Sequence, residues 1–268
     1  MKIILRIFLS LPVITVLTSC DSSTYAADPT RALYMYIFLI LALLSVLYLI
    51  FRIRRNKKRE RANSSVISFN RKVESILDKL DDPQEKIKAL QMMIDRIEDH
   101  EEYNKNRAWK YALLVTVYQH MLPVYYKLGE EEHLLEIFGR ILELSPRHAI
   151  TYYNRGSIYS NRGEYGKALE DFDKAIKYDP SYANSYNNRG LIYDKLEQYS
   201  KAIDDYSHAL ILHDSAITHF NRGKAYASLK RYNEALADYR AYLELDPYNQ
   251  ADLRDEAEQA IAGIEGKA

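Results

Sequence analysis

The sequence predicts an all-α protein in which one transmembrane helix precedes an α-solenoid of stacked antiparallel helix pairs. Near the N-terminus, one apolar segment runs for twenty residues without a charge, and three later segments share a tandem pattern at a nearly constant spacing. Only 9 Gly and 7 Pro occur in 268 residues, too few for a β-sandwich with its many turns. The 37 basic and 37 acidic side chains balance, so net charge suggests neither nucleic acid nor an acidic ligand as a partner.

The charges are divided unequally along the chain. Residues 1–61 hold ten basic and three acidic side chains, whereas residues 62–268 hold 27 basic and 34 acidic ones. The N-terminal quarter and the remainder are therefore expected to be two different kinds of structure. A single cysteine excludes a disulfide framework and any cysteine-based structural zinc site.

The first segment, residues 1–20, has the layout of an export signal, with Lys2 and Arg6 at its charged start. Its uncharged run, residues 7–19, reaches about 20 Å as a helix, short of a bilayer core of about 30 Å. The run ends in Leu17-Thr18-Ser19-Cys20, which resembles the lipobox of bacterial lipoproteins. That resemblance implies a lipid anchor on Cys20, and an uncleaved hydrophobic anchor or an ordinary signal with a chance cysteine is the alternative.

After a short external segment at 21–31, residues 32–51 (ALYMYIFLILALLSVLYLIF) contain no charge and stand between Arg31 and Arg52. As a helix they would extend about 30 Å, the thickness of the hydrocarbon layer. Tyrosines near both ends suit the positions where aromatic side chains meet the membrane surface. The sequence therefore predicts one transmembrane helix at 32–51.

A basic juxtamembrane linker at 52–65 follows, and its cations set the orientation. Seven of them lie within ten residues of the span: Arg52, Arg54, Arg55, Lys57, Lys58, Arg59 and Arg61. Basic flanks stay cytoplasmic, so the rest of the chain is expected on the cytoplasmic side of the bacterial inner membrane. These cations serve either as a stop-transfer signal or as a contact for anionic lipid, worth about 1 kcal/mol each. No aromatic residues interleave with them, so nucleic acid is not an expected partner.

The cytoplasmic part repeats the tripeptide Asn-Arg-Gly at 154–156, 188–190 and 221–223. Tyrosine follows each glycine by three residues, alanine by twelve and an aromatic residue by sixteen. These residues are Tyr159, Tyr193 and Tyr226; Ala168, Ala202 and Ala235; and Phe172, Tyr206 and Tyr239. The pattern resembles the tetratricopeptide repeat family, and the resemblance implies helix–turn–helix units that stack into a solenoid.

The spacing has a physical interpretation of its own. Residues three or four apart share one helix face, so Gly156 and Tyr159 lie on one helix and Ala168 and Phe172 on the next. The small residues leave room where the paired helices cross, and the aromatic residues fill the space beside that crossing. The middle unit has Asp214 where the other units have proline, so its turn is expected to differ.

The repeats are predicted at 149–182, 183–215 and 216–249, after a helical hairpin region at 66–114 and a degenerate repeat at 115–148. Within the hairpin region, Asp82-Pro83-Gln84-Glu85 predicts a helix start, with aspartate as the cap and proline in the first turn. Residues 250–268 are expected to form a capping helix and tail. Tyr242 stands where the earlier units have alanine, which favours an end of the array after three units.

A search for catalytic patterns finds none. The chain has no His-Glu-x-x-His or paired-cysteine ligand set, so no catalytic residue, metal or cofactor is expected, and the protein is not predicted to be an enzyme. Residues 163–167 lack the spacing of a phosphate-binding loop, and Gly163 is interpreted as a helix end. The acidic pairs Glu170-Asp171 and Asp204-Asp205 are interpreted as solvated helix faces.

The remaining candidate site is a surface. Asn154, Asn188 and Asn221 are expected to form a column in the concave groove, where an amide both donates to and accepts from a peptide backbone. Six neighbours at two further repeat positions complete the predicted partner-binding set: Tyr153, Asn187 and Phe220, then Ser157, Leu191 and Lys224. An intramolecular role, bridging neighbouring units, is the alternative for the asparagines. The chaperone-tail subgroup of the family has lysine at the Tyr153 position and asparagine at the Ser157 position, so its function is not transferred here.

The sequence therefore predicts a membrane-anchored scaffold that binds a protein or peptide partner in its concave groove. The alternative is an assembly or regulatory subunit of a membrane complex that docks through its transmembrane helix.

Overall fold

The computed structural model describes residues 29–245 and 251–266, and within these ranges the chain forms helices joined by turns, with no strand. The all-helical fold class is confirmed. The predictions for the signal at 1–20, for lipidation of Cys20 and for most of the segment 21–31 fall outside the described residues.

The chain divides into two units, residues 1–65 and 66–268. Helix α3 (Pro29–Leu77) begins in the first unit and ends in the second. Residues 32–51 fall within α3, and among them side chains are described at 44–45 and 47–51. Among the described residues, no helix combines the length and the apolar character needed to cross a bilayer.

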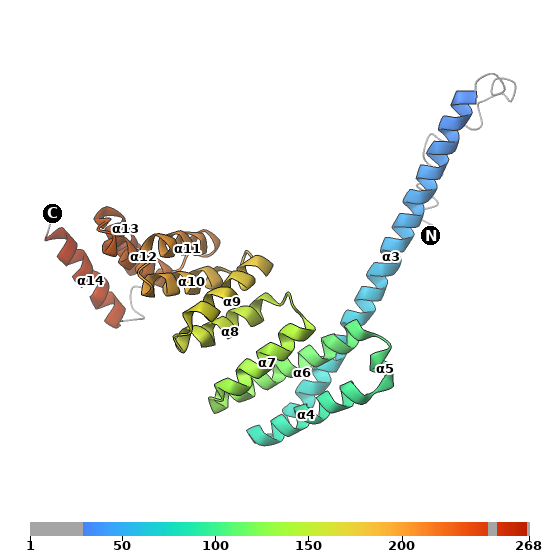
Figure 1. Ribbon diagram of the computed structural model, residues 1–268, viewed down its shortest axis with the longest axis horizontal. Helices are drawn as coiled ribbons and strands as arrows, with labels where there is room; N and C mark the ends of the chain where they lie inside the picture. The colour runs from blue at the N-terminus through green and yellow to red at the C-terminus, as the bar shows by residue number, and fades with distance from the viewer. Residues whose placement is uncertain (1–28, 246–250, 267–268) are drawn as a thin grey trace. The chain divides into compact units, whose positions relative to one another are not determined.

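The second unit is a succession of helices in which each helix from α5 to α14 packs against the one before it (Figure 1). Its helices after α3 are α4 (Pro83–Asp99), α5 (Glu101–Asn104), α6 (Arg107–Leu128), α7 (Glu131–Leu144), α8 (Ala149–Asn161), α9 (Tyr165–Tyr178), α10 (Ala183–Lys195), α11 (Tyr199–Leu212), α12 (Ala216–Ser228), α13 (Tyr232–Leu245) and α14 (Ala251–Glu265). Helices α8–α9, α10–α11 and α12–α13 form three consecutive pairs, and α6–α7 forms a fourth pair ahead of them. Each first helix also packs on the second helix of the preceding pair.

Local signals place the helix ends. The Asp82 side chain accepts a hydrogen bond of 2.9 Å from the backbone N–H of Glu85, and Pro83 opens α4, so the predicted helix start is confirmed. Inside the pairs, one turn position has a left-handed backbone each time, with φ between 59° and 72° at Gly129, Gly163, Glu197 and Lys230. The prediction that Gly163 marks a helix end is confirmed. Glycine takes this conformation freely, whereas Glu197 and Lys230 take it against the preference of residues with a Cβ.

The core of the three pairs is built from one aromatic ring against one glycine. Phe172, Tyr206 and Tyr239 are at most 3 % exposed. A Cβ added to Gly190 would lie 2.8 Å from the Tyr206 ring, and one added to Gly156 would lie 3.2 Å from the Phe172 ring. The expected close packing at the glycines is confirmed, and the group that needs the space is the aromatic ring.

The turn between α11 and α12 differs from its counterparts, as the missing proline predicts. Ser215, before α12, has φ −129° and ψ 123°, whereas Tyr182, before α10, has φ −85° and ψ 89°. His219 of α12 bonds Asp214 of this turn through Nε2 at 2.9 Å, and it bonds Asp238 of α13 through Nδ1 at 2.8 Å. A hydrogen-bonded histidine therefore ties this turn to α13.

Helix α14 closes the array. It packs against α13, and its fully buried Ala257 lies in one core cluster with Phe220 and Tyr242. Gly156 and Gly190 are 34 residues apart in the sequence, and we call this separation the repeat period. Ala257 follows Gly223 by one repeat period, at the position that small residues occupy in the first helix of each repeat. Two ion pairs add to this packing, Lys224–Glu256 at 2.8 Å and Arg240–Glu265 at 2.7 Å.

Candidate functional site

The arginine of each Asn-Arg-Gly tripeptide closes its helix pair. Arg155 donates two hydrogen bonds to the Asp171 carboxylate, from Nε at 2.7 Å and from Nη2 at 2.8 Å. The same two-bond geometry joins Arg189 to Asp205 and Arg222 to Asp238, at 2.6 to 2.8 Å. The three aspartates are only 3 or 4 % exposed. A planar guanidinium and a carboxylate in this fork arrangement form the strong class of ion pair.

The interpretation of the acidic pairs as solvated faces is wrong for Asp171 and Asp205. Their neighbours Glu170 and Asp204 are exposed, but each aspartate immediately precedes the buried aromatic residue and shares its side of the helix. A burial of this kind requires a charged partner, which the arginine provides. The sequence contains the relevant signal, because an aspartate follows the arginine by sixteen residues in all three units.

Two of these arginines also join successive pairs. Arg189 of α10 donates from Nη1 to Asp173 of α9 at 2.5 Å, and Arg222 of α12 donates from Nη1 to Ser207 of α11 at 3.1 Å. Hydrogen bonds to both carboxylates, Asp205 first, raise the pKa of Arg189 above its ordinary value despite partial burial. The equivalent position before Arg155 is Gly139 of α7, which has no side chain to accept a bond.

On the face where α10 contacts both α8 and α12, four of the predicted partner-binding residues form a hydrogen-bonded network. Asn188 donates from Nδ2 to the Tyr153 hydroxyl at 3.3 Å and to the Ser157 hydroxyl at 3.4 Å. Asn187 donates to Asn188 Oδ1 at 3.2 Å and accepts from the Thr218 hydroxyl at 3.2 Å. The network therefore connects the first helices of all three units.

The other two asparagines of the column are in a different state. Asn154 and Asn221 are half-buried, and within residues 29–245 and 251–266 their side-chain amides form no hydrogen bond. Leu191 is also half-buried, whereas Lys224 is exposed and bonds Glu256 of the capping helix. We refer to Asn154, Asn187, Asn188 and Asn221 with Tyr153, Ser157, Leu191 and Lys224 as the polar row.

Phe220 does not belong to this surface, which corrects its assignment to the partner-binding set. It is 2 % exposed, and its ring centroid lies 5.9 Å from that of Tyr239 and 5.2 Å from that of Tyr242. The large Tyr242 ring, where earlier units have alanine, provides a deep apolar contact that retains Phe220 in the core.

Asp194 is a charged residue of this face that the sequence interpretation missed. It follows Leu191 by three residues on α10, so the two side chains share a helix face. Burial raises the pKa of Asp194, and the Lys224 ammonium acts in the opposite direction. The other units have serine or alanine at this position, so no repeating pattern marks it. Within the described ranges, no group of three or more histidine, cysteine or acidic side chains is placed to hold a metal ion.

Comparisons with known proteins agree with this architecture. The family model described as tetratricopeptide repeat matches residues 149–182, 183–215 and 216–249. The solved structure of the MamA RS-1 ArsTM double mutant is 22 % identical with a TM-score of 0.53, and the match covers 68 % of this chain and 94 % of that one.

Two shorter solved domains also match. The tetratricopeptide domain of Arabidopsis OM64 is 26 % identical with a TM-score of 0.41, covering 45 % of this chain and 96 % of that one. The second such domain of human RPAP3, solved with the HSP70 peptide SGPTIEEVD, is 29 % identical with a TM-score of 0.40, covering 44 % of this chain and 94 % of that one. A search among curated proteins found no match.

Proposed function

We propose that this chain, which carries three tetratricopeptide repeats, is a non-enzymatic scaffold that binds an extended segment of a partner protein along the polar row. The observation that carries the proposal concerns the burial and hydrogen bonding of the Asn154 and Asn221 side-chain amides. Both amides are half-buried, on the first helices of the first and third units, and form no hydrogen bond within the described residues. Half-buried amides of this kind gain from a partner that supplies the missing bonds.

The chemistry of an extended peptide fits these groups. Each peptide unit presents one N–H donor and one C=O acceptor, and an asparagine amide matches both. Asn188 stands between the two unengaged asparagines in the column, and its bonds to Tyr153 and Ser157 fix its orientation. Asn188 therefore aligns neighbouring units, while Asn154 and Asn221 bind the partner.

We also propose that the protein is attached to the bacterial inner membrane, with the repeats facing the cytoplasm. The support is the uncharged sequence of residues 32–51 and the seven cations that follow it. In its described part, this segment has exposed apolar side chains, among them Leu44 at 55 %, Tyr48 at 65 % and Phe51 at 61 %. Contiguous apolar side chains of this size are disfavoured in water, which a membrane or a partner would relieve.

The experiment compares two substitutions of the column in the full-length protein. A crosslinking pulldown from membranes first identifies the partner, and titration then measures its affinity. The double variant Asn154→Ala/Asn221→Ala is expected to weaken binding about 5- to 150-fold, because each lost hydrogen bond is worth about 0.5–1.5 kcal/mol. Its thermal unfolding midpoint should stay that of the parent.

The matched variant is Asn188→Ala, which loses the bonds to Tyr153 and Ser157. It should lower the unfolding midpoint, and it should weaken binding only through that loss of order between units. If the Asn154→Ala/Asn221→Ala protein binds its partner with parental affinity, the polar row is an internal joint and the proposal is wrong.

A second pulldown separates the scaffold from the alternative of a subunit that docks through its span. Residues 32–51 are replaced by an unrelated transmembrane sequence of equal length. Partners retained after the replacement are selected by the repeats, and partners lost are selected by the span.

A further inference from the structure

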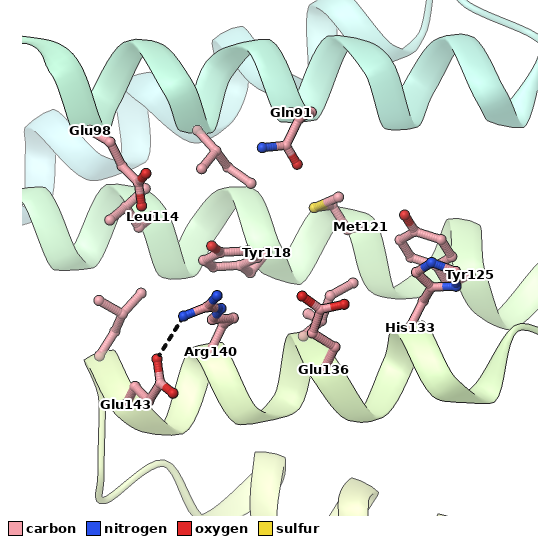
Figure 2. Close-up of a pocket in the computed structure, with 13 residues that line it drawn as sticks. Gln91, Glu98, Leu114, Tyr118, Met121, Tyr125, His133, Glu136, Arg140 and Glu143 are labelled. Atoms are coloured by element: carbon pink, nitrogen blue, oxygen red, sulfur yellow. Dashed lines mark hydrogen bonds and ion pairs between the residues drawn. The ribbon is translucent and has the colours of Figure 1, made fainter.

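A groove lies between α4 and α7, above α6, and none of the residues that line it belongs to α8, α10 or α12 (Figure 2). Its volume is about 500 Å³. Its apolar floor contains Ile94, Leu114, Met121 and Ile137, each at most 5 % exposed. We call this space the α4–α7 groove.

The groove occupies a place that arginine fills elsewhere in the array. Met121 precedes Arg155 by one repeat period, and Ile137 precedes Asp171 by the same distance along the chain. The ion pair of the regular units is therefore replaced here by two apolar side chains. Helix α6 packs on both α4 and α7, as α10 packs on both α9 and α11. In the regular arrangement, Arg189 of α10 reaches carboxylates on α9 and α11, whereas Met121 of α6 offers no such group.

The rim of the groove is acidic. Figure 2 shows Glu98 of α4 beside Leu114 and Glu136 of α7 near Met121, with Tyr118 and Arg140 between them. Within the described part of the chain, neither carboxylate takes part in an ion pair. The third acid, Glu143, is paired with Arg140 at 3.3 Å, and His133 is paired with Glu130 at 2.8 Å.

Tyr118 lies between the two walls. Burial raises the pKa of its hydroxyl, and Glu98 acts in the same direction, as do Glu136 and Glu143, whereas the Arg140 guanidinium acts in the opposite direction. Three glutamates and one arginine, Arg140, line the groove, so its net charge is negative. A ligand that matches both the apolar floor and the negative charge needs an aliphatic stem of several carbons with a cation at its end.

We propose that the α4–α7 groove binds an arginine side chain of a partner protein, presented between apolar residues of an extended segment. The aliphatic stem lies over Met121, and the guanidinium lies over Tyr118, between Glu98 on one wall and Glu136 on the other. The partner's arginine thereby takes the position that the chain's own arginine takes in the regular units. Arginine is preferred to lysine, because its planar fork can reach two carboxylates at once.

The proposal is independent of partner binding along the polar row, and one titration tests it. The probe is a fluorescein-labelled, amidated peptide Gly-Ala-Leu-Arg-Leu-Ala-Gly, added to the full-length protein in lipid nanodiscs. A second peptide replaces arginine by citrulline, which keeps the shape and removes the charge. Fluorescence anisotropy reports the Kd of each.

The variant Glu98→Gln/Glu136→Gln should bind the arginine peptide at least about tenfold more weakly, because both charge-assisted hydrogen bonds are lost. The citrulline peptide should show the same loss with the parent protein. The control Glu244→Gln removes an exposed carboxylate of α13 and should leave the Kd unchanged. None of these substitutions removes a bond in the described structure, so the unfolding midpoint should not move.

Three outcomes would overturn the proposal. Equal affinity for the arginine and citrulline peptides would show that charge is not recognised. An equal loss in Glu244→Gln would show a general charge effect without a site. A peptide that is lost from Asn154→Ala/Asn221→Ala, but retained by the Glu98→Gln/Glu136→Gln protein, would bind along the polar row instead.

Discussion

The pair α6–α7 has the same repeat spacing as the three pairs after it, but it differs from them in one contact between its two helices. Phe138 of α7 is as fully buried as Phe172 of α9, at the same repeat position. Beside it, the regular pairs have a buried arginine–aspartate ion pair, and α6–α7 has Met121 against Ile137. The packing of the aromatic residue therefore does not depend on the chemistry of the joint.

The apolar contact and the ion pair differ in how much displacement of the helices they tolerate. An apolar contact such as Met121 with Ile137 adapts to small shifts between helices, because dispersion contacts have no required direction. A guanidinium and a carboxylate buried together have to meet in one geometry, and a helix that shifts leaves a charge unpaired. We therefore expect the regular pairs to be the less adaptable part, and the α4–α7 groove to be the more adaptable one.

The largest effect is expected from breaking one ionic joint. Asp205→Ala leaves the Arg189 guanidinium with Asp173 alone, and removal of one partner from a buried pair costs about 3 kcal/mol or more. The measurement is the free energy of unfolding in urea. Asp173→Ala is the control, because this carboxylate is 58 % exposed and should cost less than about 1 kcal/mol. Equal losses would mean that burial does not distinguish the two carboxylates.

Gly190→Ala tests the second feature of the regular pairs, the ring against glycine. The new methyl group would overlap the Tyr206 ring at 2.8 Å, so we expect a loss of about 1–3 kcal/mol. A Cβ at position 156 would lie 3.2 Å from the Phe172 ring, which then has to move by only a few tenths of an ångström. Gly156→Ala should therefore destabilise the protein clearly less than Gly190→Ala. Thermal unfolding of both proteins gives the difference. Identical midpoints would contradict a tighter fit in the middle unit.

Gly139→Asp extends the ionic ladder backward into α7. The position corresponds to Asp173 in the next unit, and a Cβ there has nothing within 4 Å. The new carboxylate can accept from Arg155, and the loss of a helical glycine helps further, so we expect a gain of about 0.5–1 kcal/mol. Gly139→Asn is the matched control, with the same shape and no charge. A larger gain for asparagine than for aspartate would exclude the ion pair as the cause.

The smallest effect concerns a carboxylate buried without an arginine. Burial raises the pKa of Asp194 in the folded protein above its unfolded value. The free energy of unfolding is therefore unaffected by Asp194 below the unfolded pKa, and it falls as pH rises through the folded pKa and the buried carboxyl ionises. Asp194→Asn should therefore gain less than about 1 kcal/mol at pH 7 and still less at pH 4.5. Urea unfolding at the two pH values tests this, with the exposed Asp204→Asn as control. A gain that grows on acidification would reverse the sign of the argument.

The sequence predicted the solenoid well because its repeat period recurs at many positions. Gly156, Gly190 and Gly223 alone set the register, and the alanine and aromatic positions then follow. The resemblance to the tetratricopeptide repeat is confirmed by the family model over three units. The ionic joint was missed because neighbouring acids were compared with one another, whereas the partner of Asp171 lies sixteen residues upstream.

The polar row was predictable only in part. Repetition placed the three asparagines in one column, but their states depend on side chains in the preceding unit. Asn188 meets Tyr153 and Ser157, which both accept a hydrogen bond. The corresponding residues before Asn221 are Asn187 and Leu191, and leucine accepts none. The repeat period predicts which positions in successive units are equivalent, but the hydrogen bonds made at each position depend on the residues of the preceding unit.

The ion pair between Arg240 and Glu265 bears on how the array of repeats ends. Arg240 stands at the repeat position of Asp173 and Ser207, which accept bonds from the arginine of the following unit. A further repeat stacked on α13 would bring the arginine of its own first helix beside Arg240, so two cations would meet where the earlier units have an acceptor. The chain's own α14 brings a glutamate to the same arginine. The side chain at this position thus matches the last unit to α14 and not to another repeat of the same kind.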